Sequence, residues 1–383
     1  MIIGNILVVD DDFGTREIIK HNVIEQGHQA TAVEDGEKAI ELLKSRAFDL
    51  VLLDVLMPGL DGHEVLRRLK ADHLLRHIPV VMISGLDDIK SVVTCIEIGA
   101  EDFLTKPFDP TLLRARINSC LEKKTLRDKE QEHLAAIEAV KKRLEKELSE
   151  ASHYVRSILP QPLNTADLKV DWRYIPSNEL GGDTFGYQQI DPDHFALYLL
   201  DVCGHGVGPS LLSVSVLNAI ASEELSNTDF TKPSQVLSKL NNAFPMEKQN
   251  DMFFSIWYGV LHLPSMTLEY AGGGHPPALL HTPEHPLTEL QSSGPIIGID
   301  ADSEYHTQKQ QLLPGSKIYL YSDGVYEHQQ HDGTTVDFDS FKSILGNAAL
   351  NPTTLEILES WARETHAAPT LEDDFSIIEL SLP

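Results

Sequence analysis

A stretch of 49 residues, 111–159, contains neither glycine nor proline. Because both residue types interrupt helices, the stretch predicts one continuous helix, about 73 Å long at the usual rise per residue. Residues 122–150 carry eight basic and eight acidic side chains, so most of this helix is expected to face solvent. Such a helix separates the parts on either side of it, and we place the domain limits of the 383-residue chain at 1–122, 123–158 and 159–383.

Apolar residues recur along the helix with the spacing of a coiled coil. The two core positions of the heptad are filled by Leu134, Leu148 and Val155, and by Ile137, Leu144, Ala151 and Ile158. Lys141 interrupts the first series, which limits the seam to about three and a half heptads. The pattern favours a two-stranded parallel coiled coil and therefore a homodimer. The alternative is a single helix that packs on its own domains.

The first 110 residues alternate apolar strand-like runs with amphipathic helix-like runs. The strand-like runs are NILVVD, QATAV, DLVLLD, IPVVMIS and EDFLTK. This alternation predicts an α/β doubly wound domain with a five-stranded parallel sheet and helices on both faces. In such sheets the functional site lies beyond the carboxyl ends of the strands.

Charged and hydroxyl side chains stand at those strand ends. Asp10 and Asp11 follow the first strand, Asp54 ends the third, Ser84 the fourth and Lys106 the fifth. Three carboxylates so close together favour a divalent cation, and all-oxygen ligation favours Mg²⁺. A lone carboxylate beside a metal suits attack on a phosphoryl group, with an amine and a hydroxyl to hold the new phosphate. Any single strand-end aspartate is more often a helix cap, whereas these five residues taken together at strand ends favour a site.

The motifs VVDDD, LLDVLMPGLDG, MISG and DFLTKPF resemble those of the receiver domain of bacterial two-component response regulators, over about 120 residues. The resemblance implies that Asp54 is the phospho-acceptor and that Asp10 and Asp11 bind Mg²⁺ with it. It also implies a metal contact from the carbonyl of Leu56, phosphate contacts from Ser84 and Lys106, and a switch role for Phe103. The Lys106–Pro107 bond is expected to be cis.

Residues 159–383 change character. Short β-rich runs are spaced too irregularly for a second doubly wound sheet, and they predict an α+β domain with antiparallel sheets flanked by helices. From residue 160 onward there are 30 acidic and 9 basic residues, a charge of −21. A surface this acidic repels nucleic acid and anionic lipid, so neither is expected as a partner. With Arg173 and Arg363 as its only arginines, the domain would need a bound cation to hold phosphate.

A second set of aspartates follows glycines or strand-like runs in this part. The set comprises Asp183, Asp201, Asp323 and Asp373, with Asp374 next to the last. Four such carboxylates favour a two-metal site that activates a water to hydrolyse phosphate esters. Any one of these elements alone is more often an ordinary turn. Arg173 is either a phosphate contact or part of a solvated strand face.

As an ordered set, SILPQPL, GGD, DVCGHG, AGGGHPPALL, GPIIGI, YSDG and the final DD resemble the bacterial branch of the protein phosphatase 2C-like family, which regulates sporulation and stress sigma factors. The resemblance implies two Mn²⁺ or Mg²⁺ ions, with Asp201 as the bridging ligand and the Val202 carbonyl as a further ligand. It implies that Asp323 and Asp373 ligate the second metal and that Asp183 lies in or near the shell of the first, with Asp374 a weaker candidate. Many relatives carry a further acidic residue where this chain has Gly186.

Two histidines lie in glycine-containing loops of this part. His205, within DVCGHG, is a candidate general acid that protonates the leaving serine oxygen. The alternative is a structural hydrogen-bonding role, which we also favour for His275 in GGGHPPALL.

Together these patterns predict a response regulator whose output is a phosphoserine/phosphothreonine protein phosphatase, controlled by phosphorylation of Asp54. Expected partners are a sensor histidine kinase or phosphotransfer protein and, by resemblance, a phosphorylated anti-sigma-factor antagonist as substrate in a partner-switching pathway. The alternative is a non-catalytic adaptor that uses the phosphatase-like domain for binding. Three cysteines without metal-type spacing, no 18-residue apolar run and no basic N-terminal region predict a cytoplasmic protein.

Overall fold

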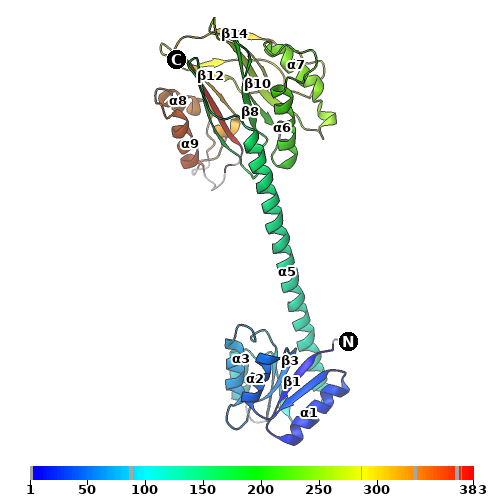
Figure 1. Ribbon diagram of the computed structural model, residues 1–383. Helices are drawn as coiled ribbons and strands as arrows, with labels where there is room; N and C mark the ends of the chain where they lie inside the picture. Colours follow the sequence, from blue (N-terminus) through cyan, green and yellow to red (C-terminus); the bar gives the residue numbers. More distant parts are fainter. Residues whose placement is uncertain (1–2, 86–88, 286, 331–333, 367–370, 372) are drawn as a thin grey trace. The chain divides into compact units, whose positions relative to one another are not determined.

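The computed structural model describes the chain except for residues 1–2, 86–88, 286, 331–333, 367–370 and 372 (Figure 1). The chain divides into two compact units, Met1–Lys142 and Arg143–Pro383. The boundary between them falls inside one helix, α5, which spans Pro110–Ile158 and confirms the continuous helix expected from the sequence. The domain limits at 122 and 158 stay predictions.

The first unit is a five-stranded parallel sheet in the order β2-β1-β3-β4-β5. The strands are β1 Asn5–Val9, β2 Gln29–Val33, β3 Leu50–Asp54, β4 Val80–Gly85 and β5 Asp102–Lys106, and the helices are α1 Phe13–Glu25, α2 Gly36–Ser45, α3 Gly62–Ala71, α4 Ile89–Ile98 and the start of α5. One apolar core lies on each face of the sheet. The doubly wound receiver fold is therefore confirmed.

Local sequence explains where the helices of this unit begin. Asp12, Asp35 and Asp61 each precede a helix, and each side chain accepts a hydrogen bond from the backbone N–H three residues on. These bonds satisfy amides that the first helical turn leaves unpaired. These three aspartates, which are not members of the predicted strand-end set, are therefore the helix caps.

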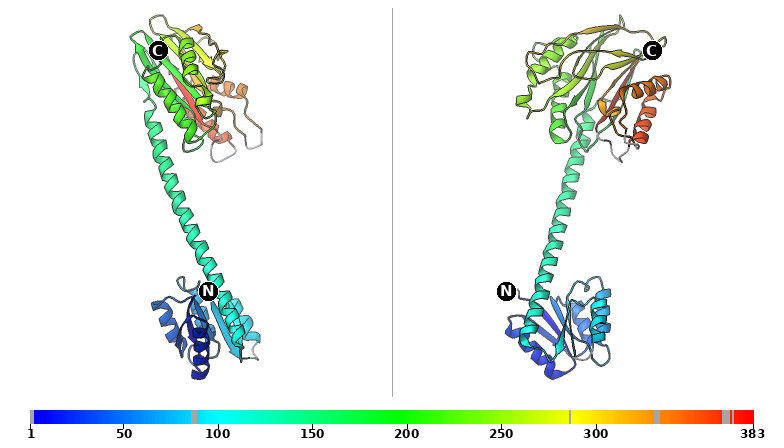
Figure 2. Two further views of the ribbon diagram at one scale, coloured as in Figure 1. Left: turned by 90° about the vertical axis from the view of Figure 1, so that its right-hand side faces the viewer. Right: turned by 180° about the vertical axis from the view of Figure 1, so that it is seen from behind.

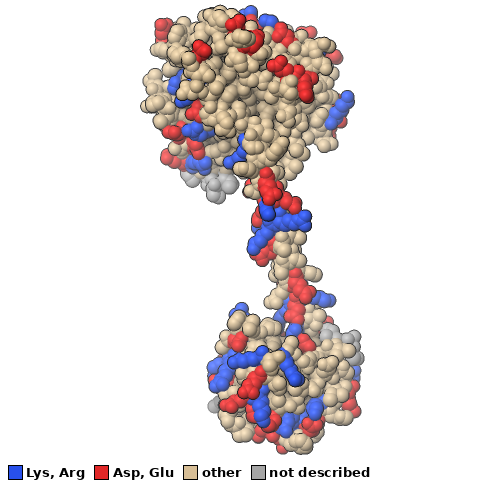
Figure 3. All heavy atoms as spheres, viewed as in Figure 1, with Lys and Arg blue, Asp and Glu red and all other residues tan. Residues whose placement is uncertain are grey.

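Helix α5 changes its environment along its length. Its first turns bury Leu113, Ile117 and Leu121 against the receiver sheet. Beyond them the helix carries interspersed acidic and basic side chains, which Figure 3 shows along its surface. The heptad residues Leu134 and Leu144 are exposed in the single chain, at 60% and 53%.

The second unit contains two antiparallel sheets, ordered β14-β11-β10-β9-β8 and β13-β12-β15-β16-β7-β6 (Figure 2). The strands of the first are β8 Thr184–Asp191, β9 His194–Val202, β10 Phe254–His262, β11 Thr267–Gly273 and β14 Gln308–Gln311. Those of the second are β6 Leu163–Asn164, β7 Lys169–Ile175, β12 Ala278–His281, β13 Thr288–Leu290, β15 Lys317–Tyr321 and β16 Phe375–Ser381. The helices are α6 Val207–Ala221, α7 Pro233–Ala243, α8 Phe338–Ala348 and α9 Thr354–Thr365, with short 3₁₀ turns at Met246–Lys248 and Asp323–Val325.

The side-chain alternation of the strands assigns each face of these sheets. In β9, Leu197 and Leu199 belong to the core shared with the second sheet, whereas Tyr198 and Leu200 pack with α6 and α7. The second sheet is covered on its outer face by α8 and α9. The result is a four-layer arrangement of helices, sheet, sheet and helices, as the sequence predicted in outline. The middle of β9, from residue 195 to 200, lacks charged side chains because both of its faces are covered.

No helix in the described part of the chain is both long enough and apolar enough to cross a lipid bilayer.

Candidate functional site

Three carboxylates meet at the carboxyl edge of the receiver sheet. Asp10 follows β1, Asp11 is its neighbour, and Asp54 ends β3, which pairs with β1 in parallel. One oxygen from each lies within 4.8 Å of the others. Asp10 and Asp54 are buried, and Asp11 is exposed at the surface. This trio can hold a divalent cation through oxygen ligands.

Lys106, at the end of β5, balances the charge of this trio. Its Nζ lies 2.8 Å from Asp10 Oδ2 and 2.9 Å from Asp54 Oδ2. Burial raises the pKa of Asp54, and the bonds from Lys106 oppose that shift. Burial lowers the pKa of Lys106, but the two carboxylates outweigh it and the net shift is upward. The following Lys106–Pro107 bond is cis, as expected.

The other receiver residues predicted from the sequence lie around this trio. Ser84 is buried at the end of β4, beside β5, and Phe103 is partly buried on β5. Leu56, in the loop after β3, has a 70% exposed side chain, so its metal role would rest on the main chain alone. Sequence reasoning missed Arg16, which donates to the carbonyls of Asp10 and Asp11 at 2.6 and 3.2 Å and holds this loop.

The second set of aspartates meets at one end of the space between the two sheets of the output unit. Asp201 has the same side-chain direction as Leu197 and Leu199 on β9, so it points between the sheets. Its cross-strand neighbour is Ser255 on β10. Asp183, just before β8, receives a hydrogen bond from Ser376 Oγ of the second sheet. Serine side chains and aspartates therefore fill this end where the apolar core stops.

Asp374 has a structural role that the sequence did not indicate. Its buried carboxylate accepts hydrogen bonds from Ser177 N and Oγ at 2.8 and 3.0 Å, from Gly182 N at 2.6 Å and from Asp183 N at 3.2 Å. These bonds fix the loop that carries Asp183. Asp373, by contrast, is exposed. The tandem Asp-Asp near the end therefore divides into Asp374, which holds the loop, and the exposed Asp373, whose Oδ1 accepts a hydrogen bond from Asp374 N at 2.8 Å. The exposure of Asp373 is in line with the preference for it as the ligand.

The electrostatics of this cluster differ from those of an ordinary surface. Burial, reinforced by Asp323, Asp373 and Asp374, raises the pKa of Asp201 to about 7. Burial and the neighbouring Asp201 raise the pKa of Asp183 well above its usual range. Burial, followed by Glu327, also raises the pKa of Asp323. The carboxylates thus lie near enough to oppose one another's ionisation, which a bound cation would relieve.

The loop DVCGHG turns sharply after Asp201. Gly204 and Gly206 have φ of 84° and 101°, which side-chain-bearing residues rarely adopt. A Cβ on Gly182 would lie 2.6 Å from the carbonyl oxygen of Val202, so this glycine lets the two loops meet beside that carbonyl. His205 is exposed in the loop.

Gly186 lies on β8 directly opposite Tyr198. A Cβ built there would lie 2.4 Å from the Tyr198 hydroxyl oxygen. The tyrosine thus occupies the space that a longer side chain would need, which accounts physically for the glycine in this chain.

Arg173 is not a member of the acidic cluster. It lies on β7 opposite Ile377, whose side chain belongs to the core under α8 and α9. Its guanidinium pairs with Glu356 and Glu359 of α9 at 3.4 and 3.5 Å. The charge therefore helps to attach α9, and the phosphate-contact interpretation finds no support.

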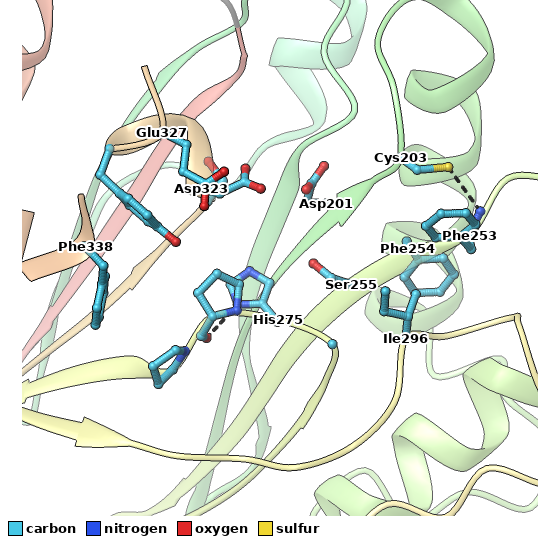
Figure 4. Close-up of a pocket in the computed structure, with 15 residues that line it drawn as sticks. Asp201, Cys203, Phe253, Phe254, Ser255, His275, Ile296, Asp323, Glu327 and Phe338 are labelled. Carbon is cyan, nitrogen blue, oxygen red and sulfur yellow. Dashed lines mark hydrogen bonds between the residues drawn. The ribbon is translucent and has the colours of Figure 1, made fainter. Parts of the chain in front are cut away.

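A cavity of about 490 Å³ opens beside Asp201 and Asp323 (Figure 4). Its lining comes from β9 and the loop after it, β10, the turn after β11, the segment between β13 and β14, the turn after β15 and the start of α8. Sequence reasoning did not find this cavity, because its walls come from segments more than 100 residues apart. Its position beside the carboxylates gives a ligand access to them.

The donor sets fit the divalent cations that the sequence implied. In the receiver, the fit rests on three carboxylate oxygens within 4.8 Å of one another. In the output unit, it rests on carboxylates whose pKa values are raised by burial and by one another, beside a main-chain carbonyl that Gly182 leaves uncovered. Among the described residues, only the receiver trio brings three ligand atoms this close, so the output cluster is the more widely spread of the two.

Comparison with known families agrees with this division. The family described as Stage II sporulation protein E (SpoIIE) matches residues 191–383, and the response regulator receiver domain matches residues 6–118.

Individual relatives match one part or the other. Phosphoserine phosphatase RsbP of Bacillus subtilis is 28% identical over 186 residues, which cover 48% of this chain and 45% of that protein. A probable transcriptional regulator, ycf27 of Cyanidium caldarium, is 35% identical over 119 residues, covering 31% of this chain and 47% of that one. These matches span about half the length of either relative.

Among solved structures, the SiaA-PP2C domain of Pseudomonas aeruginosa superposes with a TM-score of 0.56 at 22% identity, covering 64% of this chain and 98% of that one. This likeness establishes the PP2C-like fold of the output unit. The matched region of the family exceeds half of the 383 residues. The chain belongs to the Stage II sporulation protein E (SpoIIE) family and carries a response regulator receiver domain ahead of the family domain.

Proposed function

We propose that the output unit is a metal-dependent phosphoserine/phosphothreonine protein phosphatase. The observation that carries the proposal is the group of aspartates between the two sheets, whose pKa values burial and mutual repulsion raise, with a cavity of about 490 Å³ beside them. Among the described residues, no lysine or arginine forms an ion pair with Asp183, Asp201, Asp323 or Asp373, so cations have to supply the positive charge. The name of the RsbP relative, a phosphoserine phosphatase, is further support.

The proposed reaction is hydrolysis of the phosphoserine ester. When bound, two divalent cations supply an activated water and neutralise the phosphate. Asp201 and the Val202 carbonyl orient the reaction centre from β9, while Asp183, Asp323 and Asp373 complete the ligand sets. The water oxygen bonds to phosphorus and the bond from phosphorus to the serine oxygen breaks. The proton that the water loses ends on the leaving oxygen, and His205 is the candidate residue to deliver a proton there, with a structural role as the alternative.

The receiver unit is proposed to regulate this reaction. With Mg²⁺ held by Asp10, Asp11 and the Leu56 carbonyl, Asp54 takes a phosphoryl group from a sensor histidine kinase or phosphotransfer protein. Lys106 and Ser84 then contact the phosphate, and Phe103 responds to it. The first turns of α5 bury Leu113, Ile117 and Leu121 under the receiver sheet. A change in the packing of the sheet would therefore act directly on the start of the helix.

We further propose that the helix forms a parallel coiled coil in a cytoplasmic homodimer. Its heptad residues Leu134, Ile137 and Leu144 are exposed in the single chain, which supports a partner helix. The substrate proposed for the dimer is a phosphorylated anti-sigma-factor antagonist in a partner-switching pathway.

The test of the catalytic proposal uses the full chain, Mn²⁺ and a phosphoserine peptide, with inorganic phosphate as the readout. Asp201→Asn should lower the rate on the order of a thousandfold, because it removes charge at the centre of the cluster. Asp302→Asn, at an exposed position outside the cluster, is the matched control and should match the wild type. Equal rates in Asp201→Asn and wild type, or no activity in the wild type, would favour the adaptor alternative.

Regulation is tested by adding beryllofluoride, which mimics the phosphoryl group on Asp54. The rate on the protein substrate should change in the wild type and stay constant in Asp54→Asn. Equal wild-type rates with and without the mimic would contradict control by the receiver.

A further inference from the structure

The cavity beside the acidic cluster is polar in its middle and apolar at both ends. Asp201, Asp323 and Ser255 lie along the middle (Figure 4). At one end lies the ring of Phe338, and at the other lies Ile296 with Phe253 and Phe254. A phosphate held at the carboxylate cluster would therefore have apolar walls on both sides.

His275 forms part of the middle of the cavity and has an unused hydrogen-bonding atom. Its side chain is 92% buried, since the exposed fraction is 8%. Nδ1 lies 3.0 Å from the carbonyl oxygen of Pro276. A carbonyl can only accept, so Nδ1 carries the hydrogen and Nε2 keeps a lone pair. Within the part of the chain that the structure describes, Nε2 has no hydrogen-bond partner, and the atom itself is buried and closed off from the cavity.

His275 adds no charge to the middle of the cavity. Burial lowers the pKa of His275 to about 4, in keeping with a neutral ring. The charge that a ligand meets in the middle of the cavity therefore comes from the carboxylates.

We propose that this cavity recognises an extended segment of the substrate in which apolar side chains flank the phosphoserine on both sides. One flanking side chain packs on Phe338, and the other packs on Ile296. This inference rests on the proposed phosphatase function and names the substrate class that fits the site.

Charge around the cavity adds a restriction on the flanking residues. Glu327 lines the cavity next to Asp323, and its carboxylate raises the pKa of that neighbour. The output part as a whole has a charge of −21. Acidic residues beside the phosphoserine would add repulsion without any apolar contact, so they are excluded from the recognised class.

The test compares three phosphoserine peptides flanked on both sides by leucine, glycine or glutamate. The full chain with Mn²⁺ is assayed with and without beryllofluoride. In the wild type, kcat/KM for the leucine peptide should exceed that for the glycine peptide about tenfold, and the glutamate peptide should be the poorest. Ile296→Ala should reduce the leucine preference about fivefold or more. Ile299→Ala, an exposed neighbour outside the cavity, should leave the preference unchanged.

The outcomes separate this inference from the function on which it rests. Peptides hydrolysed at rates within twofold of one another, or equal leucine preferences in Ile296→Ala and Ile299→Ala, would overturn the inference and leave the phosphatase proposal standing. Failure to hydrolyse any peptide in either state of Asp54 would overturn both.

Discussion

The two aspartate clusters of this chain balance their negative charge in different ways. In the receiver, Lys106 contacts Asp10 and Asp54 directly, at 2.8 and 2.9 Å. In the output unit the described contacts to the cluster come from neutral donors instead, such as Ser376 Oγ on Asp183. Both clusters lie at the ends of apolar strands, yet only the first has a built-in cation.

This difference affects how each unit tolerates the charge of its carboxylates when no metal is bound. The receiver carboxylates can stay ionised in the folded state, because an ammonium group offsets part of their repulsion. The output carboxylates have raised pKa values, so in the metal-free folded state they bind protons more tightly than in the unfolded chain. The free energy of unfolding of this unit therefore falls as the pH rises. Metal should therefore contribute mainly to the chemistry in the receiver, and to both folding and chemistry in the output unit.

The largest expected effect is the pH dependence of the metal-free output unit. The pKa of Asp201 is raised from 3.8 to about 7, so its contribution to stability is present below pH 3.8 and is lost as the pH rises through 7. Between pH 5 and 8 we expect the free energy of unfolding of this unit to fall by about 3 kcal/mol. The fall can be measured by hydrogen exchange of β9 peptides in the full chain, with a chelator present.

Two controls accompany this measurement. Adding Mn²⁺ should abolish or reverse the trend, since a cation replaces the protons, and Asp201→Asn should flatten it. The comparison between the two clusters fails if β1 peptides of the receiver lose protection over the same pH range to the same extent as β9.

The next effect separates the neighbours Asp373 and Asp374. Asp374→Asn should destabilise the metal-free output unit by about 2 to 3 kcal/mol, because an amide group would face N–H donors that now bond to a carboxylate. Asp373→Asn, at an exposed position, should leave metal-free stability nearly unchanged and weaken Mn²⁺ binding. Denaturant unfolding and Mn²⁺ titration of both variants measure the two quantities, and equal behaviour of the pair would refute the division of roles.

A third substitution converts the receiver cluster into one that resembles the output cluster. Lys106→Ala removes the ammonium between Asp10 and Asp54, and the metal-free receiver should lose about 2 kcal/mol because those carboxylates are buried. Added Mg²⁺ should recover much of this loss, whereas it should stabilise the wild-type receiver far less. Exchange of β1 and β3 peptides reports the change, and a loss that Mg²⁺ does not recover would show that charge balance is not the cause.

Local patterns were enough to predict much of this structure. The run NILVVD and the run HFALYLLD became β1 and β9 within one or two residues of their expected limits, because continuous apolar side chains require cover on both faces. The convergence of Asp10, Asp54 and Lys106 followed from parallel topology alone, since all strand ends of such a sheet point one way.

Features formed by segments that are far apart in the chain could not be predicted from the sequence. Strand β7, with the sequence KVDWRYI, pairs with β16 some 200 residues later in the chain. The local sequence pattern of a strand does not predict which distant strand it pairs with. The roles of Asp373 and Asp374 depend on which of them faces Gly182 after folding. The cavity is lined by six separate segments, among them those of Ile296 and Phe338, so its walls exist only in the folded chain.

The smallest expected effect tests the boundary of the receiver cluster itself. Asp12 is the third acid of VVDDD, but its carboxylate accepts from Thr15 N at 2.7 Å and caps α1. Asp12→Ala should cost about 1 kcal/mol of receiver stability, the usual value of a lost N-cap, because the amide loses its partner. Mg²⁺ affinity and phosphorylation of Asp54 by a small-molecule phosphodonor should stay close to the wild type, whereas Asp11→Ala should weaken both. If Asp12→Ala lowered Mg²⁺ affinity as much as Asp11→Ala does, the cation would draw on all three acids, and the cluster would extend beyond the trio that meets within 4.8 Å.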